Sequence, residues 1–336
     1  MCLLRRQKAP LFIAGMNGFL GRSSDLRRSV GTIQERSPVI YHGASSLLRN
    51  ILITTISFFC VCNNLFSTLE SDFEEKIDSL KWIAYSPTDF NPETQEYPTG
   101  ISIREDLKTL SNAGFNGLIT YSSESILAEI PKIAKESGFK AVIMGIWDIH
   151  SQRELDNAIK MREYADGYCV GNEGINERRY ELEELRKVID YVKAKTKLPA
   201  TTSEEIRQYA KQEVAAVGDW IFPNAHPVLY NVKTPSKAVD WIKNYCKIVT
   251  RSALGQEKPV LFKEIGYPTA GDNVCNEDNQ KEFFQLMENS EVNFAYFEAF
   301  DQPWKDYLPF EPHWGVFDSQ RLPKRFIAEK VSNPHK

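Results

Sequence analysis

Short apolar runs alternate with amphipathic segments along most of the chain, from Leu80 onward. The apolar runs have the length of buried strands, whereas the segments between them repeat apolar residues at helical spacing. In the first amphipathic segment, Ile103, Leu107 and Leu110 share one helical face. The pattern predicts strands at residues 82–86, 117–121, 141–147, 167–172, 199–203, 220–226, 259–264 and 293–298, with helices between them, including 126–136, 154–164, 182–192, 204–211, 237–250 and 279–289.

Regular alternation of strands and helices predicts parallel strands joined by helical crossovers. Eight such repeats over about 250 residues match a (β/α)8 TIM barrel, an α/β fold, in number and in size. The alternative is a doubly wound open sheet, which carries a glycine-rich phosphate loop after its first strand. Residues 85–89 read Tyr-Ser-Pro-Thr-Asp at that position, without a GxGxxG motif, and this favours the barrel.

Charge divides the chain into two regions. Residues 1–68 contain eight Lys and Arg and two Asp and Glu, a net of +6, whereas the whole chain is −4, so residues 69–336 carry −10. An acidic body argues against a nucleic acid as partner, because phosphates are repelled. We expect residues 69–336 to form a single domain, which is likewise expected to be monomeric, and residues 1–68 to lie outside it.

The basic region contains one candidate targeting segment, with its apolar centre at residues 51–62. This length is typical of a signal-peptide apolar region, and it also allows a signal anchor behind a basic tail. A buried strand or helix is the alternative, and a start downstream of Met1 would explain the long leader. Membrane contact is expected only through residues 47–68. The targeting segment predicts that the protein is secreted, periplasmic or at the cell surface.

The six cysteines form no disulfide framework that can be deduced from spacing. Cys169 lies in an apolar run, where a buried, unreactive thiol is expected. A pair between Cys246 and Cys275 stays open. No group of Cys and His has the spacing of a metal site, and we expect neither a metal nor a cofactor.

The residues that end the predicted strands indicate the chemistry, because the carboxyl ends of barrel strands surround the active site. These ends carry aromatic, carboxylate and amide side chains, which suit a neutral polyol. They are Tyr85, Tyr121, Trp147, Asn172, Glu173, Asn224, His226, Glu264 and Glu298. Strand alternation is expected to turn Lys263 away from the site.

Glu173 and Glu264, 91 positions apart, each end an apolar run just before a glycine-containing turn. Two carboxylates at two strand ends are what a retaining glycosidase requires, about 5–5.5 Å apart. At that separation both cannot ionise freely, so one keeps its proton for the leaving oxygen while the other attacks the sugar carbon.

Four segments resemble glycoside hydrolase family 17, the β-1,3-glucanase family: VGNEG at 170–174, KEIGYPTAG at 263–271, FEAFDQPWK at 297–305 and HWGVF at 313–317. The similarity extends from about Trp82 to about Phe326. The resemblance implies a (β/α)8 barrel and a retaining mechanism. It makes Glu173 the acid/base and Glu264 the nucleophile.

Other residues are candidates for substrate binding. Asn172 is suited to bond the sugar 2-hydroxyl. His226 either orients Glu264 or contacts sugar, and Glu298 is either a sugar ligand or a structural partner of Lys305. Tyr85, Tyr121, Tyr267, Trp304 and Lys305 are further candidates for binding or for subsite walls.

Two positions depart from the plant members of the family and are closer to the bacterial and fungal members. Gln302 stands where plant members commonly have a glutamate, and residues 265–268 read IGYP in place of TGWP. The leading interpretation is a retaining hydrolase of β-1,3-glucan. The alternatives are a β-1,3-glucan transglycosylase, in which a sugar hydroxyl replaces water, and a non-catalytic glucan-binding protein.

Overall fold

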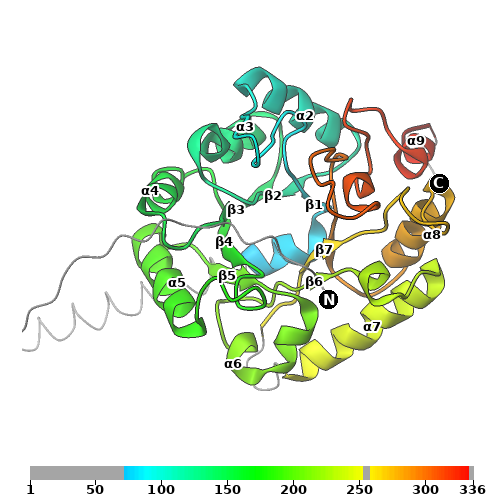
Figure 1. The fold of residues 1–336 in the computed structure, drawn as a ribbon. Helices are drawn as coiled ribbons and strands as arrows, with labels where there is room; N and C mark the ends of the chain where they lie inside the picture. The colour runs from blue at the N-terminus through cyan, green and yellow to red at the C-terminus, as the bar shows by residue number, and fades with distance from the viewer. Residues whose placement is uncertain (1–71, 253–257, 333–336) are drawn as a thin grey trace, which may run out of the picture. The chain divides into compact units, whose positions relative to one another are not determined.

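The computed structural model describes residues 72–252 and 258–332 and contains an eight-stranded parallel sheet (Figure 1). The sheet order is β5-β4-β3-β2-β1-β8-β7-β6. Each strand predicted from the sequence is present; β4 has the predicted bounds, and the other strands are one to five residues shorter. The strands are β1 (Trp82–Ala84), β2 (Gly117–Ile119), β3 (Ala141–Ile146), β4 (Gly167–Asn172), β5 (Ala200–Ser203), β6 (Asn224–Ala225), β7 (Phe262–Ile265) and β8 (Phe294–Tyr296).

The two outer strands, β5 and β6, meet and nearly close the sheet into a barrel. Glu205 and Asn224 form a parallel bridge there, and the Asn224 amide donates to the Glu204 carbonyl at 2.9 Å. Helices surround the strands (Figure 1). The predicted (β/α)8 barrel is therefore confirmed.

The helices follow the predicted amphipathic segments. Ile103, Leu107 and Leu110 are fully buried on one face of α2, and the Thr99 hydroxyl caps that helix by accepting from the Ser102 amide. The segment predicted as helix 204–211 is a 3₁₀ turn followed by a one-turn helix. The helices are α2 (Gly100–Asn112), η1 (Ser125–Glu129), α3 (Ile130–Glu136), α4 (Gln152–Lys160), α5 (Leu182–Thr196), η2 (Ile206–Ala210), α6 (Gln212–Ala215), η3 (Pro227–Tyr230), α7 (Pro235–Ser252), α8 (Glu277–Glu288), η4 (Glu311–His313) and α9 (Arg325–Ser332).

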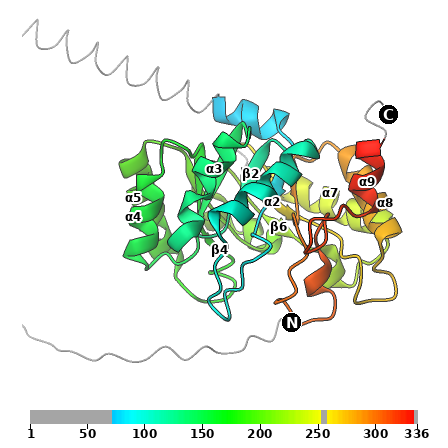
Figure 2. The same ribbon diagram turned by 90° about the horizontal axis from the view of Figure 1, so that it is seen from above.

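A further helix at residues 72–79 covers the amino-terminal end of the barrel (Figure 2). Phe73 from this helix packs on Trp220 with ring centroids 4.8 Å apart. Trp82, Trp220 and Phe222 fill the lumen at this end together with aliphatic side chains. This end is thus closed by apolar packing, so polar side chains in the lumen lie toward the opposite end.

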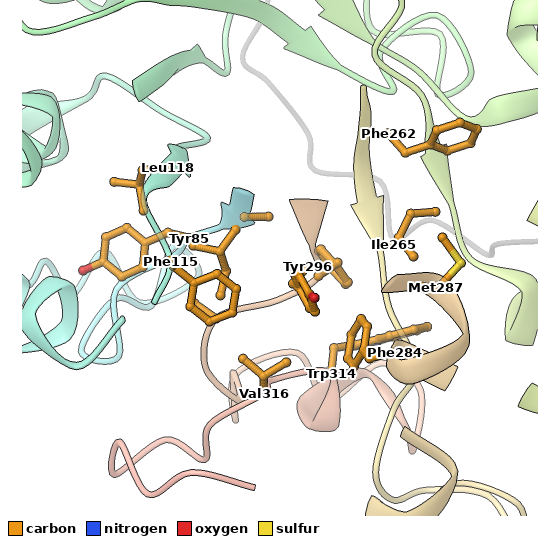
Figure 3. Packing of buried hydrophobic residues seen from close by; sticks show 14 of the residues in the cluster. Tyr85, Phe115, Leu118, Phe262, Ile265, Phe284, Met287, Tyr296, Trp314 and Val316 are labelled. Carbon is orange, nitrogen blue, oxygen red and sulfur yellow. The ribbon is translucent and has the colours of Figure 1, made fainter. Parts of the chain in front are cut away.

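A larger apolar cluster lies between the strands and the helices (Figure 3). Phe262 and Ile265 of β7 both belong to it, and they lie on the same side of the strand. Because they are three positions apart, β7 does not alternate with the regular period of two. The register between β7 and β8 shifts between these two residues.

Strand β4 contains a second irregularity, between Cys169 and Asn172, where its register with β5 shifts. Gly171 lies at this point with a φ of +73°. A Cβ atom there would meet the Tyr180 hydroxyl at 2.1 Å, so both the backbone conformation and the space require glycine. Both irregularities lie next to residues of the predicted site.

Cys169 is buried, as predicted, and Cys169, Cys246 and Cys275 are free thiols, so no bond joins Cys246 to Cys275. The helices of the described ranges include none with the length and apolar character to cross a bilayer. The predicted leader at residues 1–68 lies outside the described residues.

Candidate active site

A continuous network of hydrogen bonds joins polar side chains at the carboxyl ends of β4, β5, β6 and β7. Asn224 of β6 donates through Nδ2 to Glu173 Oε1 at 2.9 Å and to Asn172 Oδ1 at 3.1 Å. Its own Oδ1 accepts from the Ser203 hydroxyl at 2.8 Å. Asn172 Oδ1 also accepts from Lys263 Nζ at 2.7 Å, which continues the network to β7. The two predicted catalytic carboxylates therefore belong to one network.

Glu264 is buried between two donors. Its Oε1 lies 2.8 Å from Lys263 Nζ, and its Oε2 lies 3.0 Å from His226 Nε2. Burial disfavours the charged carboxylate, but the positive charge of Lys263 and the hydrogen bond from His226 outweigh it and hold the pKa of Glu264 below its usual range. Glu264 is consequently an anion at neutral pH.

Glu173 has the opposite environment. Burial raises its pKa, the negative charge of Glu264 raises it further, and the hydrogen bond from Asn224 opposes them only in part. Among the described residues, no Lys, Arg or His side chain contacts the Glu173 carboxylate. The pKa values of the two carboxyl groups are thus shifted in opposite directions.

Backbone contacts hold the segment that carries Glu173. Glu173 has a φ of +55°, and its amide donates to the Ser203 carbonyl at 2.7 Å. The buried carboxylate of Glu204 accepts from the amides of Ile175 and Asn176, just after Glu173, at 3.1 and 3.2 Å. Burial raises the pKa of Glu204 to about 7, although these amides oppose the shift. Glu204 therefore fixes the turn that follows the candidate acid.

Asn172 has a defined orientation because Lys263 and Asn224 both donate to its carbonyl oxygen. The amide nitrogen must then lie on the other side of the group. That nitrogen has no hydrogen-bond partner among the described residues. It remains available to donate to a ligand hydroxyl.

The expected direction of Lys263 is wrong, since its side chain is 1% exposed and lies within the site. Regular alternation would have turned it away from Glu264. The irregularity of β7 directs Phe262 and Ile265 outward and leaves both Lys263 and Glu264 facing the lumen.

Lys305 and Glu298 form a second buried ion pair, beyond β8, with Nζ and Oε1 2.7 Å apart. The other oxygen of Glu298 is buried and makes no hydrogen bond to the described residues. Burial raises the pKa of Glu298 to about 7 against the opposing charge of Lys305, and the charge of Glu264 adds to the increase. Trp304 lies beside Lys305 and donates to Gln302. The structural pairing considered for Glu298 is therefore present.

Tyr121 also lies at the site. Lys263 Nζ is 4.1 Å from the centre of its ring. Burial, followed by the charges of Glu264 and Glu298, raises the pKa of the Tyr121 hydroxyl, which is buried and makes no hydrogen bond to the described residues.

Tyr85 and Tyr267 are corrected, because the structure places them in the outer apolar cluster and not at the site. The Tyr85 hydroxyl donates to Asp106 of α2 at 2.8 Å. The Tyr267 hydroxyl donates to the Lys233 carbonyl, and its ring packs on Phe283. Figure 3 shows Tyr85 among these outward-facing residues.

Asn224 and Glu204 are the polar residues of the site that sequence reasoning did not assign. Asn224 lies at the end of the sixth predicted strand, and this position is the sequence feature that could have identified it as a site residue. Nothing in the sequence separates Glu204 from an ordinary surface glutamate, because its partners come from the preceding β–α loop.

Residues 83–315 match the BtgE/BtgC glycoside hydrolase domain family. The chain belongs to this family. The match confirms the resemblance to the β-1,3-glucanase type of glycoside hydrolase drawn from the four sequence segments.

Individual relatives agree with this assignment. A putative glucan endo-1,3-beta-glucosidase btgC of Aspergillus niger is 26% identical over 223 residues, 53% of this chain and 32% of that protein. A glucan 1,3-beta-glucosidase of Arthroderma benhamiae is 27% identical over 235 residues, 60% of this chain and 76% of that protein. The chain thus spans about a third of the length of the first of these relatives.

A solved structure shares the fold. An active-site mutant of the Rhizomucor miehei beta-1,3-glucanosyltransferase, in complex with laminaritriose, superposes with a TM-score of 0.61 at 22% identity. The alignment covers 74% of this chain and 96% of that one. At this level of identity the likeness supports the barrel fold.

Proposed function

We propose that the protein is a retaining glycoside hydrolase of β-1,3-linked glucan, with Glu173 as acid/base and Glu264 as nucleophile. The opposite environments of the two carboxyl groups carry the proposal. Lys263 and His226 hold Glu264 as an anion, whereas burial and the charge of Glu264 raise the pKa of Glu173 and so favour its protonated form. These are the two states that the first step of a retaining reaction requires.

In that step, a carboxylate oxygen of Glu264 bonds to the anomeric carbon as the bond to the leaving oxygen breaks. The electron pair of the leaving oxygen takes the proton of Glu173. In the second step, Glu173 removes a proton from water, the water oxygen bonds to the same carbon, and the electron pair of the ester bond returns to Glu264. Asn172 Nδ2 is suited to donate to the 2-hydroxyl during both steps.

The substrate class rests on the names of the relatives, which act on 1,3-β-linked glucan, and on the polar side chains at the site. Amide, carboxylate and aromatic groups suit a neutral sugar. Tyr121, Trp304, Lys305 and Glu298 lie at or beside the site and are proposed to contact sugar or its immediate surroundings.

The test is product analysis with the full chain on defined β-1,3-, β-1,4- and β-1,6-linked glucans. Release of β-configured product from the β-1,3-linked substrate alone is expected. Glu264→Gln and Glu173→Gln should each lower kcat by about 10⁴-fold or more on unactivated substrate, whereas the exposed Glu136→Gln should not change it. An α-configured first product, or turnover retained by Glu264→Gln, would overturn the assignment.

The same assay separates hydrolysis from transfer, because products longer than the substrate would identify a transglycosylase. Binding without turnover by the wild-type chain would identify a glucan-binding protein.

We further propose that the enzyme is a monomer that acts outside the cytoplasm, with residues 1–68 as a basic leader and an apolar signal or anchor. The uncharged run at residues 50–68 and the polymeric substrate support this. N-terminal sequencing of the mature protein and sedimentation analysis test the two statements. An intact leader on a cytoplasmic protein would contradict the proposed location.

A further inference from the structure

Lys263 is a fully buried cation that makes and breaks no bond in either step of the two-carboxylate mechanism. Its ammonium donates to Asn172 Oδ1 at 2.7 Å and to Glu264 Oε1 at 2.8 Å, and it lies 4.1 Å from the centre of the Tyr121 ring. An ammonium has three N–H donors. Two carboxyl or amide oxygens and one aromatic face therefore account for all of them.

We propose that Lys263 is a positioning residue that sets the charge of the nucleophile and the orientation of Asn172 at the same time. The proposal rests on the function proposed above. Lys263 does not touch the reacting carbon. It acts through Glu264, whose carboxylate it neutralises, and through Asn172, whose amide nitrogen it turns toward the substrate.

The role of Lys263 changes between the two steps of the reaction. Before the first step, Lys263 and Glu264 form a neutral buried pair. In the covalent intermediate, Glu264 is an uncharged ester, and Lys263 is a buried cation that has lost its counter-charge. Such a cation is costly, and the second step removes the cost because it returns negative charge to Glu264. Lys263 therefore favours departure of the sugar from the enzyme.

Other ionisable groups surround the nucleophile and were considered as alternatives. His226 contacts Glu264 Oε2, and Glu173, Glu298 and Tyr121 act on it electrostatically. Glu173 and Glu298 are acids that disfavour the Glu264 anion, and Tyr121 carries no positive charge. His226 is charged only when it is protonated. Lys263 is therefore the contact that places a positive charge against the Glu264 carboxylate, at 2.8 Å.

The kinetic test compares Lys263→Met, Lys263→Arg and wild type on an aryl β-1,3-glucan oligosaccharide with a good leaving group, so that the second step limits the rate. In Lys263→Met, kcat and KM should fall together, because the ester accumulates, with a burst of aryl alcohol in rapid-mixing experiments. The acidic midpoint of kcat/KM should move up by about one pH unit or more. Lys263→Arg should return kcat, KM and the acidic midpoint most of the way to their wild-type values.

Lys324→Met is the matched control. Lys324 is also buried and paired, with Asp301 Oδ1 at 2.7 Å, but it contacts no residue of the site network. Its loss should lower stability without moving the acidic midpoint or producing a burst. If Lys263→Met behaves like Lys324→Met, with an unmoved midpoint and no accumulation of the ester, the proposal is wrong.

A thermodynamic cycle tests the same pair without activity. Glu264→Gln alone leaves Lys263 as an uncompensated buried cation, whereas Glu264→Gln with Lys263→Met removes both charges. The double variant should unfold at a higher temperature than Glu264→Gln. A double variant that unfolds at the same temperature as Glu264→Gln or lower would refute the pairing, and this comparison does not require Lys263→Met alone to fold. Inactivity of the wild type would instead refute the proposed function and leave the cycle interpretable.

Discussion

Asn224→Ala is the most informative single substitution at the site, because the Asn224 side chain bonds both to Glu173 and to Asn172, which continues the network to Lys263. The change removes the hydrogen bonds to Glu173 Oε1 and Asn172 Oδ1 and leaves the Ser203 hydroxyl without its acceptor. Asn224 is 1% exposed, so water does not replace these contacts freely.

The size of the effect follows from the bond to Glu173. A hydrogen bond to a charged group contributes about 1.5–3 kcal/mol. The carboxylate of Glu173 forms as its proton leaves, so this amount is lost mainly from the transition state, and kcat/KM should fall about 10- to 100-fold. Since the hydrogen bond from Asn224 lowers the pKa of Glu173, its removal raises that pKa further.

The direction of the pH effect is specific. Glu173 must be protonated in the free enzyme, so a higher pKa extends the active range toward alkaline pH. The variant should therefore be slower at its optimum, with the alkaline midpoint of kcat/KM shifted upward. The assay is a pH profile of kcat/KM on a β-1,3-linked oligosaccharide, with circular dichroism to establish the fold.

Asn293→Ala provides the control, because among the described residues the Asn293 side chain bonds only to Asp78, at 2.7 Å, at the amino-terminal end of β8. It should leave the profile unchanged. An alkaline midpoint that stays in place or moves down in Asn224→Ala would refute the assignment of Glu173 as the acid.

Two further predictions concern buried groups outside the reacting pair. Tyr85→Phe should leave kcat and KM unchanged and lower the free energy of unfolding by about 1.5–3 kcal/mol, measured with urea, because Asp106 loses a hydrogen bond in the core; a change in KM would place Tyr85 at the site after all. The folded-state pKa of Glu204, about 7, lies above its ordinary value. Between about pH 4.5 and 7 the folded state therefore binds more protons than the unfolded state. Glu204 thus makes the free energy of unfolding fall as the pH rises through this range. Glu204→Gln should reduce that fall in urea titrations at pH 5 and pH 7.5, and an equal fall in variant and wild type would contradict the shift.

The fold was predictable because both of its signals are local. Buried parallel strands appear as short apolar runs, and the helices between them repeat apolar residues at helical spacing, as at Ile103, Leu107 and Leu110. The positions of Glu173 and Glu264 at the ends of β4 and β7 were predictable for a related reason, since the end of a barrel strand can be read along the chain.

The side-chain directions were less predictable, because they depend on how neighbouring strands pair. Strict alternation fails in β7, where Phe262 and Ile265 both face outward, and Lys263 enters the site as a consequence. Tyr85 and Tyr267 follow strand ends, as true site residues do, but their rings face the helices. The pairing of each strand with its neighbours determines whether a side chain at its end faces the lumen or the helices.

The irregular strands also explain how one hydrogen-bond network can shift the pKa values of two glutamates in opposite directions. A regular β7 would present Glu264 without Lys263, and burial beside Glu173 would then raise the pKa of both carboxyl groups. The shift in β7 brings a cation to one member of the pair, while the shift in β4 at Gly171 brings Asn172 to the same cation. Glu173 receives only the Asn224 amide. The asymmetry that separates acid from nucleophile therefore arises from two departures from regular strand geometry, and restoring regular alternation at either one should abolish it.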